Sequence, residues 1–74
     1  MPAPGRNLIE VTVNGEPRTV PAGQTVLGLL ESLGIPPERV AVEFNREILR
    51  RELWGTTSLA GGEQIEIVHF VGGG

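Results

Sequence analysis

A single segment of this sequence has helical spacing, and segments in which apolar and polar residues alternate lie on both sides of it. The helical segment is VLGLLESL, residues 26–33, where Val26, Leu29, Leu30 and Leu33 recur at three- and four-residue intervals. Because one helix can cover only one face of a sheet, we expect an α+β domain with one main helix packed on one mixed sheet of four or five strands. A chain of 74 residues has room for one such domain.

The segment before the helix is predicted to be a β-hairpin. Apolar residues share one face of the first strand, which begins at Leu8, namely Ile9, Val11 and Val13. Asn14 and Gly15 follow this strand and favour a type I′ turn, because both central positions of that turn need a positive φ. The returning strand places Val20 on the core side.

The ends of the helix carry capping signals. Thr25 is a suitable N-cap and Gly34 a suitable C-cap, and the Pro36-Pro37 pair prevents the helix from continuing. Gly28 is unusual, since a glycine inside a helix costs about 1 kcal/mol relative to alanine. We interpret it as a position where the sheet approaches the helix closely.

The segment after the helix contains the remaining strands. VAVEFN, residues 40–45, alternates and predicts a third strand; a turn and a brief fourth strand at Ile48-Leu49 follow. A single helical turn then places Trp54 at the rim of the core, and Leu59 anchors the next loop. The last strand, QIEIVHFV, carries apolar residues on both faces. Since one helix covers one face, the second apolar set needs a partner or a loop to cover it.

The composition excludes several classes of function. The sequence has no Cys, all six basic residues are Arg, and all nine acidic residues are Glu. Disulfides, thiolate metal sites, the lysine of a P-loop and Schiff-base lysines are therefore excluded, and His69 alone makes no metal site. A net charge of −3 argues against nucleic-acid binding, and no apolar run is long enough to span a membrane. We expect a cytoplasmic protein.

The sequence ends in three glycines, which predict a flexible tail over residues 72–74, after a domain of residues 8–71 and a flexible leader of residues 1–7. Fully extended, the chain from Val71 reaches about 13 Å, enough to enter a narrow tunnel in another protein. The α-carboxylate of Gly74 is anionic at neutral pH and a poor electrophile. Adenylation by ATP would activate it, and a sulfur nucleophile would then give an acyl disulfide or a thiocarboxylate.

From about Ile9 to Gly74 the chain resembles the ThiS family, the small sulfur carriers of thiamine thiazole synthesis, which have the ubiquitin-like β-grasp fold. The resemblance rests on four stretches: VTVNGE, QTVLGLLESLG, VAVEFNREILRRELW and GGEQIEIVHFVGGG. It includes an Asn turn at Asn45, the Arg-x-x-Trp from Arg51 to Trp54 and the terminal Gly-Gly. Family members commonly have Pro where Arg50 stands and Asp where Glu63 or Gly62 stands.

The resemblance implies that the chain is a protein co-substrate and not an enzyme. A ThiF-like adenylating enzyme would bind ATP and form the acyl adenylate of Gly74, and sulfur from a donor such as a cysteine desulfurase would replace AMP. A ThiG-like thiazole synthase would then accept the sulfur. Gly74 would be the acyl donor, Gly73 would provide steric clearance, and Gly72 would contact the partner. The chain itself would hold no cofactor.

Two surfaces are candidate docking sites for these partners. Val68 and Phe70 lie on the face of the last strand opposite Ile65 and Ile67, where they form an exposed apolar patch unless Phe70 packs on a loop. Glutamates present an acidic surface to a basic partner or are solvated strand positions, namely Glu43, Glu63 and Glu66. His69 is interpreted as a half-buried packing residue without a chemical role.

Three other functions remain open at this point. The small subunit of molybdopterin synthase shares the fold and the terminal Gly-Gly, although that family usually has a proline pair a few residues before its glycines. A ubiquitin-like modifier would join its glycine carboxyl to a lysine of another protein. In a plain interaction module the tail would be inert.

Overall fold

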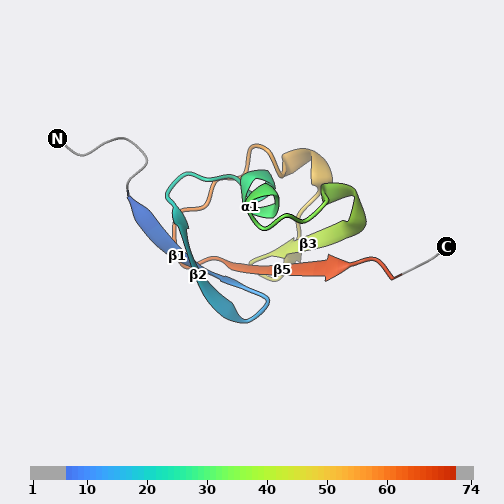
Figure 1. Cartoon of the computed structure of the whole chain (residues 1–74), viewed down its shortest axis with the longest axis horizontal. Coiled ribbons are helices and arrows are strands. Elements are labelled where there is room, and N and C mark those ends of the chain that lie inside the picture. The colour runs from blue at the N-terminus through green and yellow to red at the C-terminus, as the bar shows by residue number, and fades with distance from the viewer. Residues whose placement is uncertain (1–6, 72–74) are drawn as a thin grey trace.

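The computed structural model describes residues 7–71, in which one helix packs on a five-stranded sheet (Figure 1). The sheet order is β2-β1-β5-β3-β4; β1 and β5 are parallel, and the other neighbouring pairs are antiparallel. The predicted α+β architecture with one mixed sheet is confirmed. The elements are β1 (Leu8–Val13), β2 (Glu16–Pro21), α1 (Val26–Ser32), the 3-10 helix η1 (Pro37–Arg39), β3 (Val40–Phe44), β4 (Glu47–Ile48), the 3-10 helix η2 (Arg51–Leu53) and β5 (Gln64–His69).

Both hairpins turn through residues with a positive φ. Asn14 and Gly15 have φ values of 51° and 82°, which confirms the predicted type of turn between β1 and β2. The turn between β3 and β4 has φ values of 52° at Asn45 and 71° at Arg46. Asparagine tolerates this conformation, whereas a long side chain such as Arg46 rarely adopts it.

The caps of α1 are as predicted. The Thr25 Oγ1 accepts a hydrogen bond from the Gly28 N–H at 3.0 Å. At the other end Gly34 has a φ of 73°, and the N–H groups of Gly34 and Ile35 donate to the C=O groups of Glu31 and Leu30 at 3.1 and 3.0 Å. This is a Schellman motif, in which a residue with positive φ satisfies the last carbonyls of the helix.

The interpretation of Gly28 is wrong. A Cβ at this position would lie 3.2 Å from the Gln24 Cγ and 3.3 Å from the Thr25 Oγ1. The tight contact is therefore with the capping segment before α1 and not with the sheet.

The core lies in one layer between α1 and one face of the sheet. Its buried residues alternate along the strands, recur on the helix and include two from the connection between β4 and β5: Val11, Val13, Val20, Val26, Leu29, Leu30, Val40, Val42, Trp54, Leu59, Ile65 and Ile67. In Figure 1 α1 lies on one side of the sheet, and within the described residues no helix lies on the opposite side. We call that opposite side the outer face.

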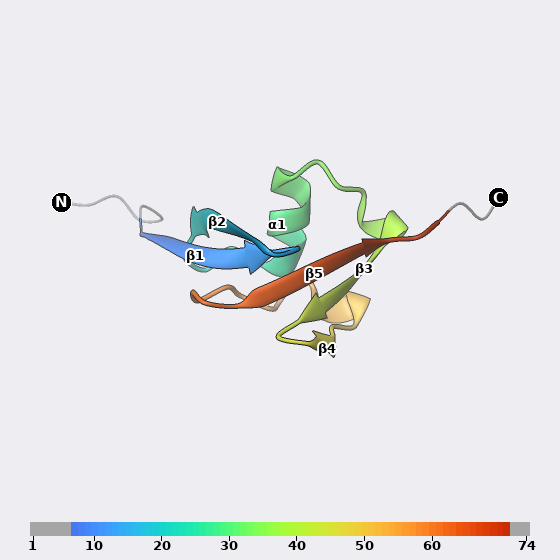
Figure 2. The same cartoon turned by 90° about the horizontal axis from the view of Figure 1, so that it is seen from below.

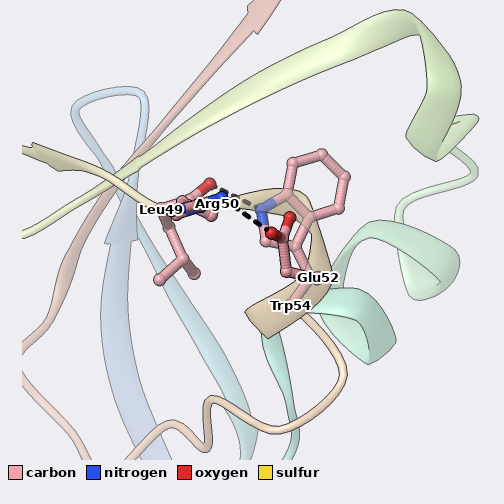
Figure 3. Close-up of polar contacts among 4 residues, drawn as sticks. All are labelled: Leu49, Arg50, Glu52 and Trp54. Atoms are coloured by element: carbon pink, nitrogen blue, oxygen red, sulfur yellow. Dashed lines mark hydrogen bonds and ion pairs between the residues drawn. The ribbon is translucent and has the colours of Figure 1, made fainter.

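The connection between β4 and β5 closes one rim of the core. The helical turn predicted before Trp54 is η2, and Trp54 is buried at 3% exposure, as is the predicted anchor Leu59 at 1%. The Trp54 indole N–H donates to the Leu49 C=O at 2.9 Å, and Arg50 pairs with Glu52 at 3.0 Å on the surface (Figure 3).

The predicted leader and glycine tail fall mainly outside the described residues. Asn7, the last leader residue, accepts a hydrogen bond from the Ala22 N–H at 2.8 Å and so continues the pairing of β1 with β2. Residues 1–6 and 72–74 are outside the described range. Within residues 7–71, the single α-helix is too short to cross a membrane.

Candidate functional site

The site begins where β5 ends, because this strand leads to the glycines. β5 lies between β1 and β3 in the middle of the sheet (Figure 2). Its register with β3 pairs His69 with Val40, and the Phe70 N–H donates to the Arg39 C=O at 2.9 Å. The main chain is thus held by the sheet as far as Phe70, which determines where the tail starts.

Arg51 braces the part of β3 that holds the end of β5. Its guanidinium donates to the Pro37 C=O at 2.6 Å and to the Val40 C=O at 3.4 Å. It also lies over the Trp54 ring, 4.7 Å from the centroid, which is a cation–π arrangement. The Arg-x-x-Trp of the sequence therefore joins η2 to the start of β3.

The predicted apolar patch is exposed in the structure. Val68 is 53% and Phe70 is 59% exposed, and the next residue, Val71, is 94% exposed. Of the two alternatives for Phe70, the structure therefore supports exposure and not packing under a loop. These three side chains surround the start of the tail with apolar surface.

Ile48 is a further exposed apolar residue of the outer face and was missed as a site residue. It is 78% exposed and lies opposite Glu43, which in turn lies opposite Glu66. Residues directly opposite one another share a face, so all three belong to the outer face. In a strand of two residues, alternation cannot indicate which side chain faces the core, so only the pairing with β3 identifies Ile48.

Two of the three candidate glutamates form an acidic pair on the outer face. Glu43 and Glu66 are cross-strand neighbours, and neither has an ion-pair partner in residues 7–71. Like charges directly opposite each other destabilise a sheet. This acidic pair therefore favours contact with a positively charged surface.

Glu63 belongs to the core side and not to the acidic surface. It is 9% exposed, and its two carboxylate oxygens accept hydrogen bonds from the N–H groups of Ala60 and Gly61, both at 2.8 Å. Both alternatives for Glu63, an acidic surface that faces a partner and a solvated strand position, are therefore wrong. Its side chain closes the loop that leads into β5.

His69 is exposed, so the expectation of a half-buried packing residue is also wrong. It follows Ile65 and Ile67 on the core side of β5, but it lies beyond the last buried residue of the strand. Two shallow hollows of about 350 Å³ each share Arg18 and Leu33: one lies between β2 and α1, and the other lies between the β1–β2 turn and the residues that follow α1. Neither hollow is lined by the exposed residues at the end of β5.

The three predicted tail residues, Gly72, Gly73 and Gly74, lie outside the described residues, so their roles remain predictions. The structure brings together Val68 and Phe70 beside the start of this tail. It adds Ile48 and the acidic pair to the same face.

Comparison with known proteins identifies the family. The model of the ThiS family matches residues 11–74. The chain belongs to the ThiS family. The match includes the hairpin turn, α1, the Arg-x-x-Trp and the whole of β5 with the three glycines, so the resemblance inferred from the sequence is confirmed.

Relatives with known names agree with this assignment. The chain is 44% identical over 50 residues to the "Sulfur carrier protein ThiS" of Bacillus subtilis, covering 68% of this chain and 76% of that protein. It is 47% identical over 66 residues to a thiazole synthase of Magnetococcus marinus, covering 89% of this chain and 20% of that protein. The chain thus spans about a fifth of the length of that synthase.

A solved structure confirms the fold. The crystal structure of the thiamine biosynthesis protein ThiS from Geobacter metallireducens superposes with a TM-score of 0.78 at 39% sequence identity. The superposition covers 89% of this chain and all of that chain. The ubiquitin-like β-grasp architecture of the ThiS family is therefore the fold of this chain.

Proposed function

We propose that this chain carries sulfur as a thiocarboxylate on Gly74 for the formation of the thiamine thiazole. A carboxylate oxygen of Gly74 attacks the α-phosphorus of ATP and displaces pyrophosphate. Hydrosulfide then adds to the acyl carbon; if a persulfide adds instead, the resulting acyl disulfide is cleaved by a thiol reductant, which leaves the thiocarboxylate. AMP leaves with the former carboxylate oxygen, so one C–S bond replaces one C–O bond.

The observation that carries this proposal is the continuous family match from Val11 to Gly74. It joins the described sheet to the three glycines without an intervening linker. Glycines have no Cβ, which allows an extended tail to pass through a narrow channel. In this mechanism Gly74 is the acyl donor, Gly73 provides clearance and Gly72 contacts the wall of the channel.

The partners follow from this chemistry. A ThiF-like enzyme binds ATP and adenylates Gly74, a donor such as a cysteine desulfurase provides the sulfur, and a ThiG-like thiazole synthase accepts it. The thiazole synthases that contain a segment similar to this chain support the last partner. The chain is a co-substrate that binds no cofactor and acts in the cytoplasm.

The outer face is the proposed docking surface. Val68 and Phe70 provide apolar area at the end of β5, Ile48 provides apolar area level with Glu66 on the same face, and the acidic pair provides charge. Buried apolar anchors contribute most of the energy of an interface, whereas charges mainly raise the rate of association. A partner with a basic, apolar surface next to its channel fits this arrangement.

The test is sulfur loading measured by intact mass. Incubated with a purified ThiF-type enzyme, ATP and sulfide, the wild-type chain should gain the mass of one oxygen-to-sulfur exchange. Deletion of Gly74 should abolish this gain and leave the melting temperature unchanged, because among residues 7–71 the last main-chain hydrogen bond along β5 is that of Phe70, four positions before Gly74.

The other outcomes separate the alternatives. A covalent adduct between the chain and a lysine of another protein would support a modifier. Transfer of the sulfur to a molybdopterin precursor and not to a thiazole synthase would support the molybdopterin synthase reading. An unchanged mass would contradict the proposal, and a lower melting temperature after the deletion would mean that the tail is structural.

A further inference from the structure

On the side where it pairs with β1, β5 extends beyond the end of its neighbour. The parallel register pairs Thr12 with Gln64 and Val13 with Ile65, and β1 ends at Val13 whereas β5 continues to His69. Figure 2 shows β5 running past the end of β1 towards the tail. On the other side, β3 stays paired with β5 as far as His69.

Asn14 directly follows the last residue of β1 and continues its hydrogen bonding with β5. The Asn14 main-chain N–H donates to the Ile65 C=O at 2.9 Å, which is the last main-chain bond along this side. The Asn14 side chain then accepts from the Ile67 N–H at 2.7 Å and donates to the Ile67 C=O at 3.3 Å. The Asn14 side-chain amide thus makes the two hydrogen bonds that a continuation of β1 would make with its main chain.

The next main-chain groups on this side belong to His69. Successive residues of a strand direct their N–H and C=O groups to opposite neighbours. Since Ile67 bonds to Asn14 and Phe70 bonds to Arg39 on β3, the N–H and C=O of His69 face the side that β1 has left. Within residues 7–71 neither group has a hydrogen-bond partner on that side, and His69 is exposed. We call this the open edge.

We propose that the adenylating enzyme that receives the tail also binds the open edge of His69. An extended segment of this enzyme would pair with β5 there as an additional strand. This inference rests on the proposed function. Main-chain hydrogen bonds of this kind recognise extended segments independently of side chains. A segment bound here would continue the sheet and fix the direction in which the tail leaves it.

The short distance between His69 and Gly74 favours the adenylating enzyme as the partner that binds the open edge. Gly74 is five positions after His69, so the chain between their Cα atoms spans at most about 18 Å. An enzyme that holds Gly74 in its active site therefore has its surface within this distance of the open edge. By contrast, the far edge of the sheet is blunted, because Pro17 and Pro21 lie on β2 and have no N–H to offer.

Hydrogen exchange of individual amides tests the inference. In the free protein the His69 amide should exchange fast and the Phe70 amide, which bonds to Arg39, should exchange slowly. In the complex with a purified ThiF-type enzyme and ATP, exchange at His69 should slow by about tenfold or more, whereas Phe70 stays slow. An unchanged His69 amide in a complex that still loads sulfur would overturn the inference.

Proline variants give a second measurement. His69→Pro removes the outward N–H and should weaken binding to the same enzyme about tenfold more than His69→Ala, which keeps that N–H. The matched control is Thr19→Pro on β2, where the register also directs the N–H away from the neighbouring strand. Equal affinities of the proline and alanine variants at position 69 would overturn the inference. If His69→Pro does not fold, the hydrogen exchange of the His69 amide in the wild type is the deciding measurement.

Two further outcomes distinguish this inference from the proposed function. Absence of sulfur loading in the wild type would overturn the function, and the inference with it. Normal loading with protection of His69 only at high concentration of the chain alone, seen together with a dimer in sedimentation, would identify a second copy as the occupant and overturn the inference alone.

Discussion

At the scale of single residues, two polar side chains form hydrogen bonds with main-chain groups that have no main-chain partner. Glu63 accepts from two N–H groups, and the Asn14 amide bonds to both main-chain groups of Ile67. Buried or half-buried main-chain groups without partners are costly, so such side chains stabilise the ends of strands and loops. These two residues hold both ends of β5 where the regular pairing stops.

Glu63 provides the test at this scale. Glu63→Gln replaces one acceptor oxygen by a donor that faces an N–H group, and should lower the free energy of unfolding by about 1 to 3 kcal/mol. The measurement is urea unfolding. Glu31→Gln, a change on the exposed side of α1, should leave the stability unchanged. Equal stabilities of the two variants would contradict the role assigned to Glu63.

At the scale of elements, the edge strand β2 differs from the open edge of β5. The Ala22 N–H bonds to the Asn7 C=O, and by alternation the main-chain groups of Pro17, Thr19 and Pro21 face away from β1. Two of these three residues have no N–H. The β2 edge is therefore protected against pairing with other chains, whereas β5 keeps the N–H of His69 on its open edge.

Restoring the missing donors tests this view of β2. The double variant Pro17→Thr with Pro21→Thr presents three outward N–H groups and should self-associate at concentrations where the wild type is monomeric. Sedimentation velocity measures the association. Pro36→Thr, a change before η1 and outside the sheet, should not associate. A monomeric double variant would show that the prolines do not protect the edge.

At the scale of the whole molecule, the residues that form the core and the residues proposed to contact a partner lie on opposite faces of the sheet. α1 and one face of the sheet contain the buried core, whereas the outer face holds Ile48, Val68 and the acidic pair. A sheet covered on one side exposes its other side, and in this chain that side carries exposed apolar residues and the acidic pair. In the proposed function, one partner would contact this face and also receive the glycine tail.

The acidic pair tests this division. Glu43→Gln with Glu66→Gln removes a like-charge contact and should raise the free energy of unfolding by up to about 1 kcal/mol. The same variant should associate more slowly with a basic adenylating partner, with a weaker dependence on salt. Chemical denaturation and stopped-flow binding measure the two effects.

The control for the acidic pair is Glu16→Gln with Glu31→Gln. It removes the same number of charges from exposed positions outside the outer face. If both double variants slowed association equally, the net charge and not the position of the acidic pair would be responsible.

Much of the fold was predictable because its signals are local. The turn at Asn14-Gly15, the caps Thr25 and Gly34, and the alternation in β1, β3 and β5 all act over a few residues. The site was predictable where it depends on alternation, as for Val68 and Phe70. It was not predictable for Ile48, whose face follows from pairing with β3, or for Glu63, whose carboxylate turns back to the N–H groups of Ala60 and Gly61 in the folded loop.

The sequence by itself determined the elements, the turns and the family, since periodicity, turn chemistry and motifs are properties of neighbouring residues. Only the tertiary structure decided that Glu63 is buried, that Glu43 and Glu66 are neighbours, and that β5 has an open edge at His69. These features depend on register between distant segments, as in the contact of Asn14 with Ile67, which are 53 residues apart. Register follows from the packing of the whole sheet on α1, which no local pattern contains.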